Sequence, residues 1–211
     1  MDVLPQTILF LGIIPALVLL YLSLKKYDGL YKEKTMFIMF IGGIIAGVLS
    51  IIIEYATIQV GFFAIILFPV LEHLFKTVIL NMRRFHNKKE VVLYGLSLGL
   101  GFGSVFTPYY IIITSLNYDD NISLVIALIA SIGVIILHGA TGVLIGYGVY
   151  SSNLIKFFIF AILLYIPVII TSSIQYSAFL IIIYGLVVYW YVTTKIMPNI
   201  LIDSKKASKA K

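Results

Sequence analysis

Long apolar blocks recur along this chain, separated by short connections that carry charged or turn-forming residues. A helix needs about 20 apolar residues, at 1.5 Å per residue, to cross the ~30 Å hydrocarbon core of a bilayer. Only 11% of the 211 residues are charged, whereas a soluble domain carries about a quarter. So few charges cannot coat a globule in water, and we therefore expect an all-α, multi-pass transmembrane helix bundle.

Seven such blocks are expected to span the membrane and to form one domain over residues 1–196. Their approximate bounds are 7–24, 35–53, 59–82, 91–115, 122–150, 154–174 and 177–195. The remaining residues, 197–211, are predicted to form a short basic tail in the cytosol. No basic residue precedes the first block and four lysines follow it, so we expect it to be retained as a span and not cleaved as a signal peptide.

The basic residues predict the orientation of the chain, because Lys and Arg are retained on the cytoplasmic side of a membrane. Fourteen of the 15 fall in alternate connections or in the tail: Lys25, Lys26, Lys32, Lys34, Arg83, Arg84, Lys88, Lys89, Lys156, Lys195, Lys205, Lys206, Lys209 and Lys211. With seven spans, this pattern places the N-terminus outside and the C-terminus in the cytosol of a cell-membrane protein. The net charge of +6 is then a topology signal, so we expect membrane lipids as partners and no nucleic acid.

The remaining basic residue, Lys76, lies within the third block, four residues after Glu72, so both side chains project from one helix face. His73 lies between them. A charge deep in a bilayer costs at least ~2.5 kcal/mol, so three ionisable residues in five positions indicate a function. The simplest alternative is a buried ion pair between Glu72 and Lys76 that fixes helix packing. Glu54, at the outer end of the second block, is expected to lie at the membrane interface.

The fifth block carries His138 at a depth that matches Glu72. Glu72 precedes Arg83 by about eleven residues, or roughly 16 Å of helix, and His138 precedes Tyr150 by about twelve, or roughly 18 Å. Because both distances are measured from the cytosolic face, both side chains are expected at similar depth and in reach of each other. A lone buried histidine more commonly serves helix packing, and that alternative stays open for His138.

A carboxylate and imidazoles around a wet cavity can activate water for attack on a peptide bond, with an imidazole stabilising the oxyanion. Glu72, His73 and His138 could equally form a triad for a divalent metal such as zinc. The same residues would serve a proton-coupled transporter. The chain contains no cysteine, which excludes a thiol nucleophile.

Three stretches resemble the PrsW-like and CAAX-prenyl-protease-like glutamic intramembrane peptidases. They cover residues 65–150, and the matching positions are Pro69, Glu72 and Lys76, then Tyr94, Gly95, Gly99, Gly101 and Phe102, and finally His138 and Gly146. The resemblance implies that Glu72 is the general base and His138 an oxyanion or substrate-polarising group. It also implies a peptide or membrane-protein substrate and supporting roles for Lys76, Gly99, Gly101 and Thr107.

Two positions depart from the family pattern. His73 occupies the place of the family's second glutamate, and Phe106-Thr107 occupies the place of a Glu-Asn pair. His73 would then stand in for a carboxylate as a third catalytic residue. The departures leave a second interpretation open, a catalytically altered relative that acts as a membrane transporter, a substrate-binding protein or a chaperone.

Overall fold

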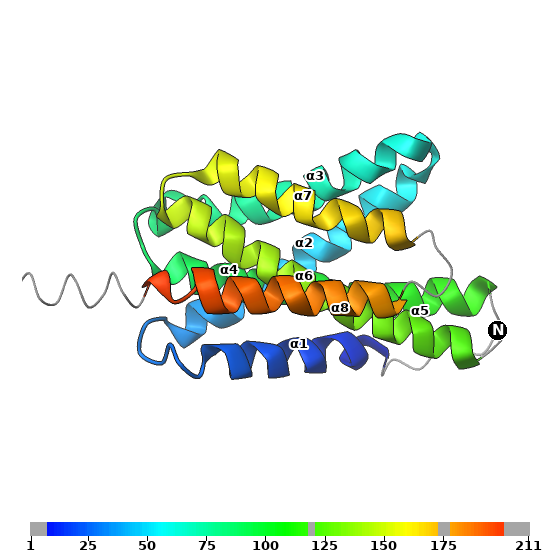
Figure 1. The fold of residues 1–211 in the computed structure, drawn as a ribbon, viewed down its shortest axis with the longest axis horizontal. Coiled ribbons are helices and arrows are strands. Elements are labelled where there is room, and N and C mark those ends of the chain that lie inside the picture. Colours follow the sequence, from blue (N-terminus) through cyan, green and yellow to red (C-terminus); the bar gives the residue numbers. More distant parts are fainter. Residues whose placement is uncertain (1–7, 118–120, 173–177, 201–211) are drawn as a thin grey trace, which may run out of the picture.

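The computed structural model describes residues 8–117, 121–172 and 178–200, and within them the protein is an all-α bundle without a β-strand (Figure 1). Its helices are α1 (Ile8–Leu24), α2 (Glu33–Ala56), α3 (Ala64–Leu80), α4 (Glu90–Ser104), α5 (Phe106–Asn117), α6 (Asn121–Tyr150), α7 (Leu154–Ser172) and α8 (Ala178–Tyr191). Two short 3₁₀ segments, Ile58–Phe63 and Arg83–Phe85, and a π-helical turn, Val192–Ile196, complete these parts of the chain.

Six segments of the described chain are long and apolar enough to cross a membrane: Glu33–Ala56, Gln59–Leu80, Glu90–Ser115, Asn121–Tyr150, Leu154–Thr171 and Ala178–Ile196. Helix α1 is also apolar but has only 17 residues between Ile8 and Leu24. The outward surface of the bundle exposes large apolar side chains along most of its helices, as lipid contact requires. The protein is therefore a multi-pass membrane protein, with six clear spans and a seventh, shorter apolar helix.

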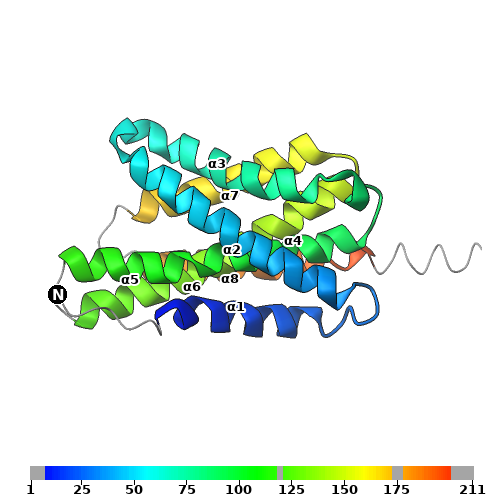
Figure 2. The ribbon, with the colours of Figure 1, turned by 180° about the vertical axis from the view of Figure 1, so that it is seen from behind.

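The basic connections gather at one end of the bundle. The turns after α1, after α3 and after α6 lie at the left in Figure 1, together with the π-helical turn that carries Lys195. Figure 2 shows the same grouping from behind, while the tip between α2 and α3 lies at the opposite end. The alternation of charge along the sequence thus corresponds to a spatial separation.

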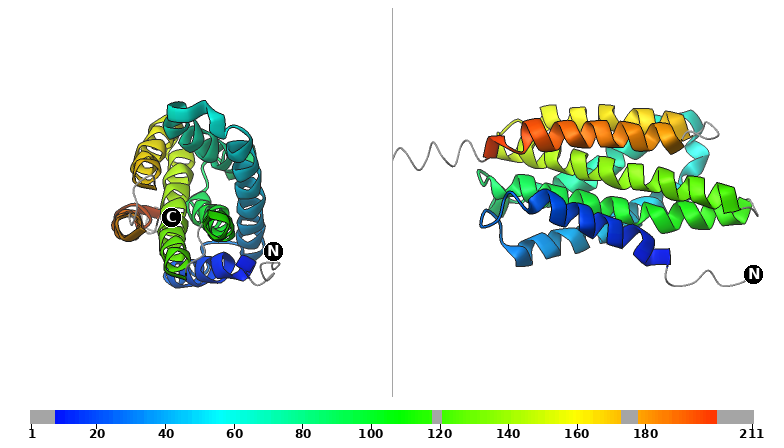
Figure 3. Two further views of the ribbon diagram at one scale, coloured as in Figure 1. Left: turned by 90° about the vertical axis from the view of Figure 1, so that its right-hand side faces the viewer. Right: turned by 60° about the horizontal axis from the view of Figure 1, so that its bottom comes forward.

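Helix α4 forms the centre of the fold, because every residue from Val91 to Ser104 is buried. The view along the bundle shows this green part of the chain inside a ring of other helices (Figure 3). Glycines permit this close packing. A Cβ on Gly95 would lie 2.2 Å from the carbonyl oxygen of Gly142 on α6, and one on Gly99 would lie 2.1 Å from that of His138. Only glycine allows the two backbones to approach so closely.

The block predicted as one span over 91–115 consists of two helices, α4 and α5, that meet at Val105. Proline at position 108 explains the interruption. It has no N–H to donate to the carbonyl of Ser104, and its ring opposes that carbonyl in a continuous helix. Helix α4 accordingly ends at Ser104, and α5 begins at Phe106.

Candidate functional site

A cluster of polar side chains lies between two layers of helices. Helices α3 and α7 lie side by side along one side of the bundle, with α4 and α6 beneath them (Figures 1 and 2). Glu72 is 1% exposed, and His73, Lys76 and His138 are 0% exposed. The structure thus brings together the ionisable residues that the sequence singled out on the third and fifth apolar blocks.

Lys76 extends from α3 to α6, where its ammonium group has two polar contacts. Its Nζ lies 2.7 Å from Nδ1 of His138 and donates a hydrogen bond to Oγ1 of Thr141 at 3.2 Å. The same Nζ lies 4.7 Å from the ring centroid of Phe102 on α4, a cation–π distance. The buried cation is therefore held by an imidazole, a hydroxyl and an aromatic face.

Nε2, the other ring nitrogen of His138, faces Glu72 and Tyr165. Nε2 of His138 lies 3.1 Å from the hydroxyl oxygen of Tyr165, on α7, and 4.0 Å from Oε2 of Glu72. Oε2 of Glu72 has no direct hydrogen-bond partner in the described part of the protein. A distance of 4.0 Å is too long for a direct hydrogen bond, but one water molecule could bridge the two atoms.

In its charged form, Lys76 selects the tautomer of His138. A charged lysine has only hydrogen-bond donors, so Nδ1 of His138 must accept, and the ring proton then resides on Nε2. That proton points toward Tyr165 and Glu72. The imidazole is thus oriented as a donor toward the carboxylate, on the side where a polarising group would act.

Aromatic rings enclose His138. The ring of Phe102 lies 4.9 Å from it, centroid to centroid, and the ring of Phe106 stacks on it at 5.1 Å with an interplanar angle of 27°. Phe106 occupies a position at which the peptidase family that the sequence resembles has a carboxylate. In this chain that position supplies an apolar wall to the histidine and no charge.

His73 belongs to the cluster but turns one nitrogen to its own helix. Nδ1 lies 2.7 Å from the carbonyl oxygen of Pro69, so Nδ1 carries the proton and donates. The ring packs edge-on against Tyr165 at 5.5 Å, and Nε2 has no hydrogen-bond partner among the described residues. His73 therefore lines the site, and Pro69 fixes its orientation.

These contacts do not fit the metal triad that the sequence left open. Both ring nitrogens of His138 already face polar partners, whereas Nε2 of His73 has none among the described residues. Within residues 8–117, 121–172 and 178–200, no three His, Cys, Asp or Glu side chains converge to hold a metal ion. The arrangement offers a carboxylate beside an imidazole, which suits proton transfer.

Glu54, which was expected at the membrane interface, lies near the cluster. Its carboxylate accepts a hydrogen bond of 2.8 Å from Ser50, one turn earlier on α2, and it interacts electrostatically with Glu72 and Lys76. Beyond the end of α2 the chain continues through the 3₁₀ segment Ile58–Phe63 into α3. A second carboxylate therefore adjoins the site.

Apart from Lys76, the three other supporting residues expected beside the site have different surroundings. Gly99 faces the backbone of His138 and sets the distance between α4 and α6 there. Gly101 faces the other way, toward Phe40 of α2, where a Cβ would lie 2.1 Å from a carbonyl oxygen. Thr107 is buried near Gly12 of α1, and its hydroxyl has no hydrogen-bond partner in the described chain. Gly99 alone of the three packs directly on the cluster.

Tyr165 and Thr141 were not anticipated from the sequence, although both contact the central residues. Thr141 follows His138 by three residues and shares its helix face, a spacing that could have identified it. Tyr165 lies on α7, an almost wholly apolar helix whose sequence shows no polar stripe. Only the packing of α7 against α3 identifies it.

Comparison of the chain with protein-family models, with curated proteins and with solved structures finds no match.

Proposed function

We propose that this is a cell-membrane protein, with its N-terminus outside and its C-terminus in the cytosol, that hydrolyses peptide bonds within the bilayer. The observation that carries the proposal is the approach of Glu72 Oε2 to His138 Nε2, 4.0 Å apart in a buried site. The stretches of residues 65–150 that resemble glutamic intramembrane peptidases support it. Its substrate would be a peptide or a membrane protein.

Each side chain has a role in this proposal. Glu72 accepts a proton from the attacking water, because its Oε2 is free of direct partners in the described chain. His138 donates from Nε2 to the developing oxyanion. Lys76 is a positioning residue that holds the histidine in the donating tautomer through Nδ1.

Substrate access requires movement, because the four ionisable residues of the cluster are at most 1% exposed. Helices α3 and α7 cover the cluster on one side and α4 and α6 on the other. The lipid-facing pair, α3 and α7, would have to part to admit a peptide. Peptide hydrolysis is therefore expected to be slow and gated by helix separation.

The direct test uses the purified protein in liposomes and a library of quenched fluorescent peptides with apolar segments. Glu72→Gln should reduce cleavage by at least ~100-fold, the usual contribution of a general base, while thermal unfolding in detergent stays close to wild type. Glu33→Gln, an exposed carboxylate at the start of α2, is the matched control and should cleave normally. Equal cleavage by wild type and Glu72→Gln would refute the proposal.

A second function is favoured by one further observation, the continuous buried contact from Lys76 through His138 to Tyr165. Such a chain can pass protons, as a proton-coupled carrier requires. Liposomes that contain a pH-sensitive dye would distinguish the two functions. A pH-driven flux that Tyr165→Phe abolishes, without any peptide cleavage by the wild type, would favour the carrier.

A further inference from the structure

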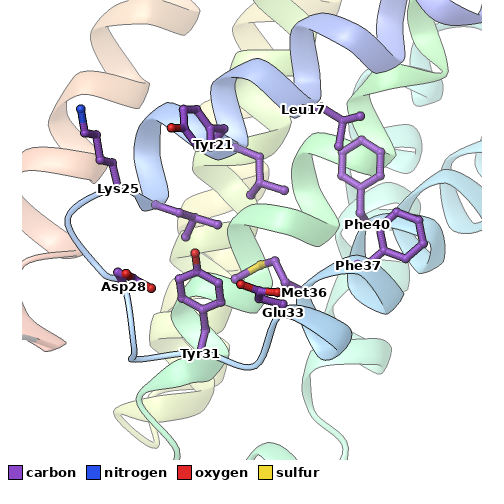
Figure 4. A pocket seen from close by; sticks show the side chains of 11 residues that line it. Leu17, Tyr21, Lys25, Asp28, Tyr31, Glu33, Met36, Phe37 and Phe40 are labelled. Atoms are coloured by element: carbon purple, nitrogen blue, oxygen red, sulfur yellow. The ribbon is translucent and has the colours of Figure 1, made fainter.

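Two grooves of similar size open on the outer surface at the end of the bundle that carries the basic connections. One lies between α1 and α2 and has a volume of about 570 Å³ (Figure 4). The other lies between α6, α7 and α8 and has a volume of about 580 Å³. Both fall within the range of roughly 300–1,000 Å³ that is typical of ligand sites. Neither is lined by Glu72, His73, Lys76 or His138.

The groove between α1 and α2 has a polar end of mixed charge. Lys25, Asp28 and Glu33 line it, and Figure 4 shows them away from the apolar part that Leu17 and Phe40 form. The single cation is accompanied by two carboxylates. An anionic headgroup would therefore meet repulsion as well as attraction there.

The groove between α6, α7 and α8 has a different polar end. Among the residues that the structure describes, its charged lining residues are Lys156, in the first turn of α7, and Lys195, in the π-helical turn after α8, and no carboxylate of the described chain lines it. The walls beyond the two lysines are apolar and aromatic, with Phe157, Phe160 and Trp190 among them. The groove thus offers two cations at the membrane interface and an apolar channel that runs from them toward the bilayer core.

We propose that this groove is a binding site for one phospholipid with a net negative headgroup. The two lysines would contact the phosphate and the acyl chains would lie along the aromatic wall. Basic pockets between spanning helices on the cytoplasmic side suit anionic lipids, and each lysine near the surface contributes ~1 kcal/mol. The proposal depends on the membrane location of the bundle and not on the proposed peptidase activity.

Trp190 provides a specific probe, because it is the single tryptophan of the chain and lines the groove. The full-length protein would be reconstituted in phosphatidylcholine vesicles with increasing fractions of phosphatidylglycerol that carries brominated acyl chains. Bromine quenches tryptophan fluorescence on contact. The same series with brominated phosphatidylcholine gives the reference, and the ratio of the two quenching curves gives the relative binding constant.

We expect phosphatidylglycerol to bind about 25-fold more strongly than phosphatidylcholine at low salt, or about fivefold per lysine. Lys156→Ala and Lys195→Ala should each lower that preference about fivefold, and the double variant should abolish it. Lys25→Ala, at the same end of the bundle but in the mixed-charge groove, is the matched control and should keep it. A variant with alanine at Lys205, Lys206, Lys209 and Lys211 tests the basic tail in the same way and should also keep it.

Three results would overturn the proposal. Equal quenching of the wild type by both lipids would show that no anionic lipid is selected. A preference that survives in the Lys156→Ala, Lys195→Ala double variant would place the selection elsewhere. Complete competition by millimolar inorganic phosphate would show an anion site that does not need a lipid.

Discussion

The ammonium group of Lys76 lies 2.7 Å from Nδ1 of His138, on a helix across the bundle, although Glu72 lies one turn away on its own helix. No ion pair within 4.0 Å joins Lys76 to Glu72, both of which lie in the described chain. The two charges instead act on opposite nitrogens of one imidazole ring. The structure therefore does not contain a direct packing ion pair between Glu72 and Lys76 on α3, the alternative that the sequence left open.

Replacement of Lys76 by methionine should change the tautomer of His138. The methionine fills a similar volume but cannot donate to Nδ1, so the proton is no longer confined to Nε2. Activity should fall on the order of 100-fold or more, as when a catalytic histidine loses its orienting partner. The ¹⁵N NMR shifts of the three histidines, with His73 and His86 assigned by substitution, would report the change directly.

The exposed Lys34→Met is the control for that experiment and should leave the His138 signals unchanged. Wild-type protein that already shows a protonated Nδ1 would contradict the inferred hydrogen-bond order.

Removal of the Tyr165 hydroxyl should separate function from stability. Tyr165→Phe leaves Nε2 of His138 without its nearest partner in a buried site, which should cost about 1–3 kcal/mol of unfolding free energy. Tyr184→Phe is a matched control, because its hydroxyl donates to the carbonyl of Leu164, away from the cluster. Thermal unfolding should shift for both variants, whereas only Tyr165→Phe should alter cleavage or proton flux. Loss of function in both variants would point to a global structural effect.

The contact between α4 and α6 can be tested by adding one methyl group. A Cβ at position 99 would lie 2.1 Å from the carbonyl oxygen of His138, so Gly99→Ala must push the helices apart. We expect a loss of about 1–3 kcal/mol, typical of overpacking, and a disturbed His138 environment. At Gly42 the nearest atom to a new Cβ is 3.8 Å away, so Gly42→Ala should change stability by less than ~0.5 kcal/mol. Equal melting temperatures of the two variants in detergent would contradict this packing.

The orientation in the membrane can be mapped with single cysteines, because the chain has none of its own. Lys26→Cys and Lys88→Cys, both exposed, should react with a membrane-impermeant maleimide only after the cells are opened. Gln59→Cys, at the opposite end of the bundle, should react in intact cells. The reverse pattern would invert the proposed topology.

Most of the architecture could be predicted from the apolar blocks, because hydrocarbon imposes helices of fixed minimum length on any chain that crosses it. The bundle is all-α, and six of the expected spans are present as long apolar segments. The interruption at Val105 was within reach of the sequence, since Pro108 stands four residues after Ser104. Block length alone does not reveal such a break.

The site was only partly predictable, because the sequence gives the depth of a residue along its helix more readily than the direction in which its side chain points. Spacing along α3 and α6 fixes the depth of Glu72 and His138, which the structure places side by side. On α7, residue spacing does not show which face packs against the bundle, because a helix that is apolar on every face has no polar stripe to orient it. Tyr165 therefore became visible only through packing.

Helix α4 is enclosed by protein along its whole length, and its span is the least apolar of the six. Contact with lipid therefore stabilises this segment less than it stabilises the other spans. Contacts with the surrounding helices have to complete its insertion into the bilayer. During synthesis α4 emerges before α6, its main partner. Until α6 has been made, α4 must stay in the membrane or at the insertion machinery without that packing partner. Truncation before residue 121 should consequently leave the centre of this protein as its most poorly inserted part.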